Sequence, residues 1–251
     1  MIEINITNFI VEPKNVFDEK LSLVGDEARH LCKVLRAKVG DSFYAIDGTG
    51  LRYRAVIESI SASKVSGIIS STTRKENEPA INLTLAQGIC RPAKMDLIVE
   101  KGTELGLSSF IFYFSEKSYK KGTANTGQSI KISRLERLAR ASAKQSLRSI
   151  VPSITMAADF ISLAKLSKEY DYSLMAYPGA ESKLLLNYKE KLSEGKKVLL
   201  LVGPESGLSL DEIEMALAKG FLPIRLGPRR LRTETAGIIF PALLLNLLGE
   251  I

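Results

Sequence analysis

The chain has 251 residues, of which 45% are hydrophobic and 25% charged, which is the composition of a folded globular protein with one large domain or two ordinary ones. Its single histidine and two cysteines, Cys32 and Cys90, exclude a disulfide-rich scaffold and a four-ligand zinc site. We therefore expect two buried thiols and no metal. The formal net charge of +7 suggests an anionic partner.

From the sequence we expect neither a secretory signal nor a membrane anchor. The N-terminal stretch MIEINITNFI lacks a basic start and a small-residue cleavage site. The longest apolar run, residues 238–248, contains Pro241 and Asn246 and is shorter than the ~20 residues that span a bilayer. We expect a cytoplasmic protein that does not contact membranes.

The first part of the chain, residues 1–72, is rich in short runs of alternating apolar and polar residues, which predict β-strands. One helical stretch interrupts them at residues 25–41, and Asp26 is placed to cap its start. Short strands with a single helix predict a small β-barrel. The polar segment STTRKENEPA, residues 71–80, marks the boundary with a second domain, residues 80–251.

The second part alternates strands with helices. The predicted strands are residues 81–88, 109–114, 170–178, 196–203 and 221–227, and the predicted helices are residues 94–106, 133–149, 209–220 and 233–249. Strands that alternate with helices of this length predict a mostly parallel sheet covered on both faces, which is an α/β fold.

Basic residues gather in one segment, residues 117–148. It contains nine of them and a single acid, Glu136, so it alone carries a net charge of +8 and the rest of the chain is close to neutral. Its basic residues are Lys117, Lys120, Lys121, Lys131, Arg134, Arg137, Arg140, Lys144 and Arg148. Such a run is either a solvated helix face or a surface that attracts phosphates.

Two loops with glycines follow predicted strands, which is where ligands bind in open α/β sheets. The first loop lies in LLLVGPESGLSLDE, residues 199–212, with Gly203 and Gly207 in GxxxG spacing. It matches neither the dinucleotide motif GxGxxG nor a Walker A loop. The sequence therefore predicts neither a dinucleotide cofactor nor a nucleoside triphosphate.

The second loop lies in LGPRRLRTETAG, residues 226–237, and puts three arginines between two apolar segments. Thr233 is a good N-cap for the helix that follows, and Glu234 suits its first turn, so neither residue needs another role. Burying an unpaired guanidinium group costs on the order of several kcal/mol. The arginines must reach solvent, a carboxylate or an anionic ligand, and we favour the ligand.

Five segments resemble, in the same order, those of the ribosomal small-subunit methyltransferase E family of the SPOUT class. They are HLCKVLR, KMDLIVEKGTELG, ASAKQSLRSIVP, LVGPESGLSLDEIE and LGPRRLRTETA. One departure is Ser206, where the family pattern Gly-Pro-Glu-Gly-Gly has glycine. If that position requires a positive φ, serine costs on the order of 1 kcal/mol there.

The resemblance implies an RNA-binding, PUA-like β-barrel at residues 1–72 and, from residue 80, an α/β domain whose C-terminal chain forms a deep trefoil knot. It implies a homodimer, S-adenosylmethionine as cofactor, and methylation of N3 of one uridine in 16S rRNA of the small ribosomal subunit. The alternatives are a SPOUT enzyme that methylates a ribose 2′-oxygen of rRNA or tRNA, and an RNA-binding protein without catalysis.

For such an enzyme, the cofactor site needs apolar walls, backbone hydrogen-bonding groups and an open path to the transferred methyl group. The two loops, together with the end of an earlier strand, can supply all three. The predicted cofactor-binding residues are Ala176, Tyr177, Val202, Gly203, Pro204, Glu205, Gly207, Leu226, Gly227, Leu231, Arg232, Thr235 and Ala236.

Methylation of uridine N3 requires loss of the N3 proton and stabilisation of the charge that develops on the ring carbonyls. Arg232 is predicted to stabilise this charge, because a guanidinium group never loses its own. Glu205 and Glu234 are the candidate bases, and catalysis by positioning alone is the alternative. The predicted RNA-binding residues are Arg29, Lys33, Arg36, Arg91, Lys94, Lys131, Arg134, Arg137 and Arg148.

Overall fold

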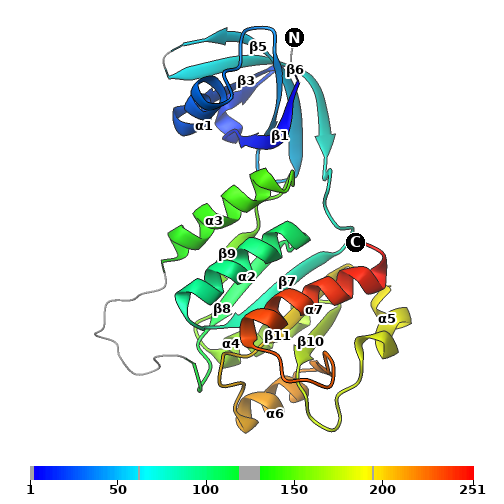
Figure 1. Cartoon of the computed structure of the whole chain (residues 1–251). Helices are drawn as coiled ribbons and strands as arrows, with labels where there is room; N and C mark the ends of the chain where they lie inside the picture. Colours follow the sequence, from blue (N-terminus) through cyan, green and yellow to red (C-terminus); the bar gives the residue numbers. More distant parts are fainter. Residues whose placement is uncertain (1–2, 62, 119–130, 194) are drawn as a thin grey trace. The chain divides into compact units, whose positions relative to one another are not determined.

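The computed structural model describes residues 3–61, 63–118, 131–193 and 195–251, which form two compact units (Figure 1). The first unit comprises Met1–Glu78 and Arg140–Val151, and the second comprises Pro79–Ala139 and Pro152–Ile251. The chain leaves the first unit within the segment where the sequence predicts a boundary. Residues 140–151 belong to the first unit, although the sequence assigns them to the second domain.

The first unit contains a mixed six-stranded sheet with the order β1-β4-β5-β6-β3-β2, in which only β1 and β4 pair in parallel. Its elements are β1 (Glu3–Ile10), η1 (Pro13–Asn15), β2 (Val16–Phe17), β3 (Lys20–Val24), α1 (Gly25–Arg29), η2 (His30–Val34), β4 (Ser42–Ile46), β5 (Leu51–Ile60) and β6 (Lys64–Arg74). No pairing among the described strands joins β1 to the two-residue strand β2. Where the sequence predicts a barrel, the described strands therefore form a sheet that hydrogen bonds do not close.

One face of this sheet carries the core of the first unit. Phe9, Leu21 and Phe43 are fully buried in one apolar cluster, and the rings of Phe9 and Phe43 meet edge to face with centroids 5.8 Å apart. The helical stretch adds Leu31 to the same cluster. Its start differs from the prediction, because Asp26 lies inside the first turn of α1 and does not cap it.

Arg148 and Glu78 form a buried ion pair in the first unit, with side chains only 2% and 3% exposed. Nη2 of Arg148 lies 2.6 Å from Oε2 of Glu78, and Oε1 of Glu78 accepts hydrogen bonds from the backbone N–H groups of Ser149 and Ile150. The structure corrects the prediction that Arg148 binds RNA. Its charge is already balanced by a carboxylate, and its side chain does not reach the surface.

The second unit contains six parallel strands with the order β12-β10-β11-β7-β8-β9. Its elements are β7 (Asn82–Gly88), α2 (Pro92–Leu105), β8 (Ser109–Tyr113), α3 (Ile132–Gln145, which ends in the first unit), β9 (Ser153–Met156), α4 (Phe160–Lys165), η3 (Leu166–Glu169), β10 (Tyr172–Ala176), η4 (Leu185–Tyr188), α5 (Lys189–Ser193), β11 (Lys197–Val202), α6 (Leu210–Ala218), β12 (Leu222–Ile224) and α7 (Thr233–Leu248). The predicted parallel sheet is confirmed.

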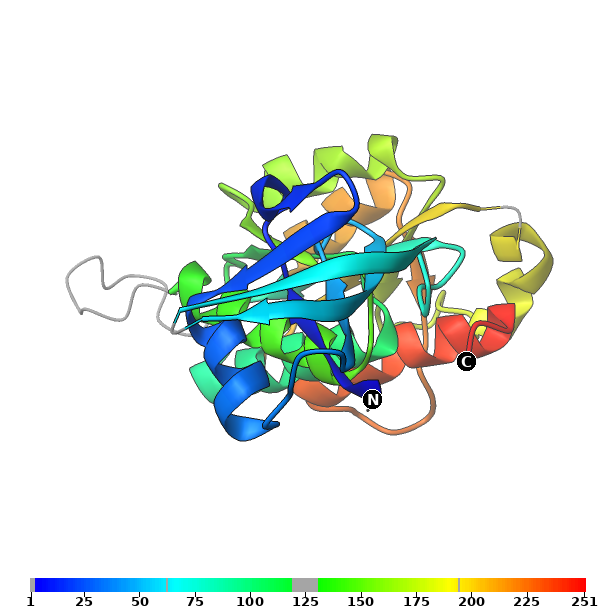
Figure 2. The same ribbon diagram turned by 90° about the horizontal axis from the view of Figure 1, so that it is seen from above.

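Helices cover both faces of this sheet. α2 and α7 pack against each other on one face, where α7 also contacts β7 and β11, and α4 packs against α6 on the other face. Seen from above, the sheet lies between these two layers (Figure 2). In the part of the chain that the structure describes, no helix is long and apolar enough to cross a membrane.

The short strand β12 lies between two segments that precede it in the chain. On one side it pairs with β10. On the other side, the backbone N–H of Arg225 donates to the carbonyl of Lys183 at 2.9 Å, and the N–H of Lys183 donates to the carbonyl of Pro223 at 3.3 Å. The chain that leaves β10 therefore passes along the outer side of β12, and α7 then returns to the middle of the sheet.

Five short elements of the second unit were not predicted from the sequence: β9, α4, η3, η4 and α5. β9 has four residues and α4 has six, so neither is long enough to show a clear hydrophobic period. The predicted helix 133–149 ends earlier, at Gln145, and Leu147 then takes a left-handed backbone with φ of 59°. Local pattern alone does not fix such boundaries.

We predict that Arg148→Met destabilises the first unit by about 3–5 kcal/mol, because it leaves the carboxylate of Glu78 buried and unpaired. The measurement is urea unfolding followed by circular dichroism. The matched control is Arg29→Met, which breaks an exposed pair with Asp26 and should cost less than about 1 kcal/mol. Equal stability of the two variants would contradict a structural role for Arg148.

Candidate cofactor and RNA site

Four segments of the second unit meet at the carboxyl edge of the parallel sheet. They follow β7, β10, β11 and β12, and they comprise residues 88–91, 177–183, 203–209 and 225–232. Parallel strands end at the same edge, which is where open α/β sheets bind ligands. All predicted cofactor-binding residues lie in the last three segments or at the adjoining ends of β10, β11 and α7.

A buried polar contact joins three of these segments. Nε2 of Gln87, at the end of β7, donates to the hydroxyl of Thr233 at 2.9 Å and to the carbonyl of Gly203 at 3.3 Å. The hydroxyl of Thr233 in turn donates to the same carbonyl at 2.6 Å. The prediction that Thr233 caps α7 is wrong, because Arg232 holds the cap position and Thr233 is the first helical residue.

Two glycines allow this close approach. A Cβ atom on Gly88 would lie 2.5 Å from the backbone nitrogen of Pro204, and one on Gly237 would lie 2.8 Å from Oε1 of Gln87. Both distances are far below van der Waals contact. The loop after β11 and the start of α7 therefore pack directly on the end of β7, with glycine as the only residue that fits without a shift.

The loop after β11 accommodates Ser206 without left-handed backbone. Ser206 is not among the residues with positive φ, whereas Gly207 has φ of 76°. Ser206 therefore does not incur the free-energy cost of a left-handed backbone that we considered from the sequence. A Cβ atom on Gly207 or Gly227 would meet nothing within 4 Å, so both glycines border open space.

Lys94, in the first turn of α2, joins the two candidate bases. Its Nζ lies 2.7 Å from Oε1 of Glu205 and 3.0 Å from Oε2 of Glu234. Nε of Arg91 lies 3.8 Å from the same Glu205 oxygen. The start of α2, the loop after β11 and the start of α7 thus share one group of opposite charges.

This ion pairing sets the protonation of the group. Desolvation alone would raise the pKa of Glu234, but a hydrogen bond from its own backbone N–H and the Lys94 ammonium group hold that pKa below its ordinary value of 4.5. Hydrogen bonds to Glu205 and Glu234 raise the pKa of Lys94. Lys94 is therefore a cation and Glu234 a carboxylate near neutral pH, which makes Glu234 a weak proton acceptor.

The thiol of Cys90 lies close to these charges but is buried. Burial, followed by the negative charge of Glu205, raises the pKa of Cys90 to about 12. The group is thus a thiol and not a reactive thiolate at neutral pH. Cys32 is only partly buried. Among the described residues, no three His, Cys, Asp or Glu side chains come together as a metal site.

The arginines of the loop after β12 reach the surface, which is one of the three alternatives that the sequence leaves and is compatible with the favoured one, an anionic ligand. Arg229, Arg230 and Arg232 are exposed, and none of them forms an ion pair with another described residue. Leu226 and Leu231 beside them are half-buried. The loop therefore exposes its cationic groups to solvent, while its apolar side chains are partly covered.

The predicted RNA-binding residues fall into three groups. Arg29, Lys33 and Arg36 are exposed in the first unit, and Lys131, Arg134 and Arg137 are exposed at the start of α3, where Arg134 pairs with Asp96. Arg91 and Lys94 lie at the carboxyl edge of the sheet, and Arg148 is buried as described above. Lys120 and Lys121 lie outside the described residues.

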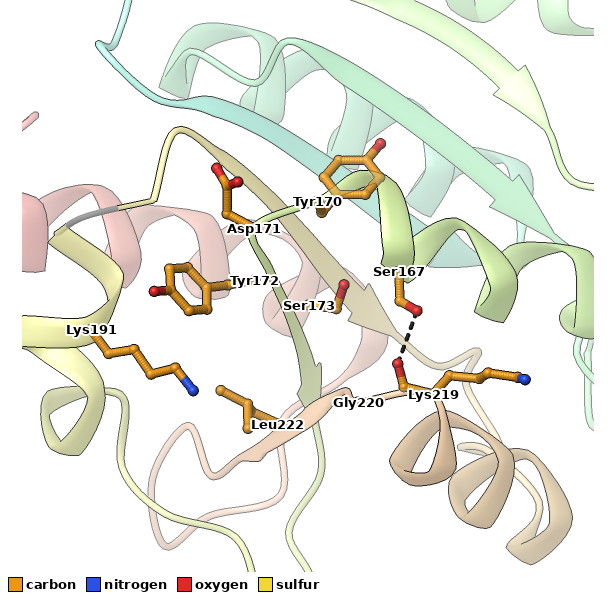
Figure 3. A pocket seen from close by; sticks show the side chains of 9 residues that line it. All are labelled: Ser167, Tyr170, Asp171, Tyr172, Ser173, Lys191, Lys219, Gly220 and Leu222. Carbon is orange, nitrogen blue, oxygen red and sulfur yellow. Dashed lines mark hydrogen bonds between the residues drawn. The ribbon is translucent and has the colours of Figure 1, made fainter.

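A separate pocket of about 300 Å³ opens at the opposite, amino-terminal edge of the same sheet (Figure 3). Tyr172 and Ser173 of β10 line it, together with Lys191 and with Lys219, whose carbonyl accepts a hydrogen bond from Ser167. None of the predicted site residues lines this pocket. The chemistry of the candidate site therefore belongs to the carboxyl edge.

Sequence reasoning missed Gln87 and Gly88 and gave Thr233 the wrong role. The available signal was a glutamine near the end of the predicted strand INLTLAQG, directly after the apolar pair Leu85 and Ala86. A buried amide needs partners, so Gln87 itself marks a place where another segment must approach. The order of the strands determines which segment approaches Gln87, and this order cannot be read from the local sequence.

The comparisons with known proteins agree with this geometry. The family model described as an RNA methyltransferase domain matches residues 76–245, and the one described as an RNA methyltransferase PUA domain matches residues 23–70. Ribosomal RNA small subunit methyltransferase E of Bacillus subtilis is 30% identical over 219 residues, which cover 86% of this chain and 85% of that protein.

Two solved structures are similar over almost the whole chain. A "probable rRNA-methyltransferase" from Porphyromonas gingivalis is 29% identical, with a TM-score of 0.80 and coverage of 96% of this chain and 98% of that one. A protein from Legionella pneumophila, described as a methyltransferase in complex with the cofactor SAM, is 25% identical, with a TM-score of 0.80 and coverage of 97% and 98%.

We predict that Thr233→Val lowers the free energy of unfolding of the second unit by about 1–3 kcal/mol. The variant keeps the shape of the side chain but removes one hydrogen-bond partner each from the buried amide of Gln87 and from the partly buried carbonyl of Gly203. Thr233→Ser keeps the hydroxyl and should retain most of the stability. Thermal unfolding measures the stability of both variants. If Thr233→Val were as stable as wild type, the contact would not stabilise the second unit.

Proposed function

This chain belongs to the ribosomal RNA small subunit methyltransferase E family, and from that premise we propose that it methylates N3 of one uridine in 16S rRNA of the small subunit. The observation that carries the proposal is the carboxyl edge of the parallel sheet, where Gln87 and Thr233 hold the two predicted cofactor loops together. The cofactor is S-adenosylmethionine, and we place the reaction in the cytoplasm.

The residues at this edge suit S-adenosylmethionine. That cofactor carries no phosphate, and neither loop is a phosphate-binding motif. Its adenosine part needs apolar walls and backbone contacts, which Leu226, Leu231 and Ala236 with the open glycines Gly207 and Gly227 offer. We assign the holding of the cofactor to Ala176, Tyr177, Val202, Gly203, Pro204, Glu205, Gly207, Leu226, Gly227, Leu231, Arg232, Thr235 and Ala236.

When bound, the cofactor supplies an electrophilic methyl group. The work left to the chain is to position the uridine and to stabilise the charge that its ring gains when the N3 proton leaves. We assign this stabilisation to Arg232, which is exposed, unpaired among the described residues, and at the very start of α7. Glu205 and Glu234 are already bound to Lys94, which favours a positioning role over a role as base.

We further propose that the C-terminal chain is threaded as a trefoil knot of the SPOUT class. Its support is the position of β12, hydrogen-bonded to β10 on one side and to Lys183 on the other, with α7 returning to the middle of the sheet. We also propose a homodimer that covers the outer side of α2 and α7. The large apolar side chains of Leu97, Ile239 and Leu243 are exposed on these two helices.

RNA binding follows from the exposed basic residues. We assign contacts with RNA to Arg29, Lys33 and Arg36 of the first unit, which contains the PUA domain, and to Arg91, Lys131, Arg134 and Arg137 of the second. Chemistry at N3 needs an exposed Watson–Crick edge, so the target uridine must be unpaired or extruded from its helix.

We predict that Arg232→Ala lowers kcat for RNA methylation by roughly 100-fold to 1,000-fold, the range for removal of one charge-stabilising donor. The matched control is Arg225→Ala, an exposed arginine earlier in the same segment, which should stay within about threefold of wild type. The assay is methyl incorporation into ribosomal RNA, with the product mapped by nucleoside mass spectrometry.

The product decides between the proposed function and its rivals. 3-Methyluridine in the wild-type reaction supports base methylation, whereas a 2′-O-methyl nucleoside would overturn it. Full turnover of Arg232→Ala would remove this arginine from the mechanism. A wild-type protein that binds RNA but no S-adenosylmethionine would be an RNA-binding protein without catalysis.

The start of α3 provides a further test, now of RNA binding. We predict that replacing Lys131, Arg134 and Arg137 by Gln weakens RNA binding and flattens its salt dependence by about 0.7–0.9 in the logarithmic slope for each phosphate that the protein no longer neutralises. The control replaces three exposed lysines elsewhere, Lys165, Lys168 and Lys189, with the same change of charge. Equal slopes for the two triple variants would make the α3 face a plain solvated surface.

A further inference from the structure

Lys94 stands at an unfavourable place in its own helix. It is the third residue of α2, and the first turn of that helix contains no acidic residue. The amino end of a helix carries partial positive charge, so a cation there weakens the helix. When a residue destabilises its own helix, the reason for its presence is expected in its contacts with other parts of the fold.

The reason is visible in the partners of Lys94. Its ammonium group touches Glu205, in the loop after β11, and Glu234, in the first turn of α7. One flexible side chain therefore connects the two loops to which the cofactor is assigned. Both oxygens contact the same nitrogen, so they lie within about 6 Å of each other, a range in which like charges repel strongly.

We propose that Lys94 is a positioning residue of the methyltransferase site: its ammonium group holds the carboxylates of Glu205 and Glu234 together, fixes the loops that bind the cofactor, and does not contact RNA. The inference rests on the proposed function for the identity of the cofactor. It replaces the prediction that Lys94 binds RNA, since an ammonium group with two carboxylate partners has little charge left for a phosphate.

The charges around this group are few. Arg91 approaches Glu205 at 3.8 Å, and Arg232 exerts a weaker attraction on Glu234. The thiol of Cys90 is uncharged at neutral pH. Without Lys94, the two carboxylates would face each other with only these more distant cations, and the loops would separate.

The experiment compares three variants in their binding of S-adenosylmethionine by calorimetry, without RNA. Lys94→Met removes the charge but keeps much of the side chain, and we expect at least tenfold weaker binding. Lys94→Arg keeps the charge and should bind within about threefold of wild type. The double variant Lys94→Met/Glu234→Gln removes one carboxylate as well, so the repulsion is absent and most of the affinity should return.

A second readout distinguishes positioning from general damage to the fold. In Lys94→Met, proximity of the two carboxylates raises the pKa of one of them, so it gains a proton as the pH falls. We expect the cofactor affinity of this variant to recover as the pH is lowered from neutral and one of the two carboxylates gains a proton, while that of wild type changes little over the same range. A variant that is merely unstable would not recover at lower pH.

RNA binding measured without cofactor can overturn the proposal. The proposal expects wild-type RNA affinity and salt slope in Lys94→Met. A loss of RNA affinity with unchanged cofactor affinity, equal in the single and double variants, would overturn the proposal and restore Lys94 as an RNA contact. If wild type bound no S-adenosylmethionine, the proposed function itself would fail, whereas binding that Lys94→Met leaves intact would contradict only the role of Lys94.

Discussion

The contact of Gln87 with Gly203 and Thr233 is the interaction on which the candidate site depends. Three segments that are far apart in the chain meet at one edge of the sheet, where the buried amide of Gln87 donates to Thr233, to Gly203 and to the carbonyl of its neighbour Gly88. Glycines at positions 88 and 237 make that approach sterically possible. Gly207 and Gly227, which border open space, thus lie in loops whose ends are held in place by this contact.

The presence or absence of a carboxylate partner within the protein distinguishes the basic residues that stabilise the fold from those that are available to bind a ligand. Arg148, Lys144 and Arg134 belong to the basic segment, yet each has a carboxylate partner, and the pair of Arg148 is buried. Arg229, Arg230 and Arg232 have no such partner among the described residues. Net charge therefore overstates the RNA-binding surface of residues 117–148, because part of that charge is neutralised by the protein's own carboxylates.

The sequence predicted what local pattern determines and failed where partners are distant in the chain. The apolar runs of β7, β8 and β11 and the helical periods between them are local signals, and the parallel sheet followed from them. The burial of Arg148 depends on Glu78, 70 residues earlier. Thr233 looked like a cap because Thr is a good cap residue, while its actual partner Gln87 lies 146 residues away.

The position of Lys94 bears on how a uridine could be activated without a strong protein base. A carboxylate paired with an ammonium group and held below its ordinary pKa, as Glu234 is, accepts a proton poorly. A cation near an acid lowers that acid's pKa by about 1–3 units, and the N3 group of uridine is such an acid. Arginines that face the uridine would therefore ease the loss of its proton to water, and Lys94 would keep the negative carboxylates engaged so that they do not oppose this effect. In the proposed arrangement, Arg232 would supply both activation and stabilisation through one charge, and the two glutamates would contribute by holding the loops that place it.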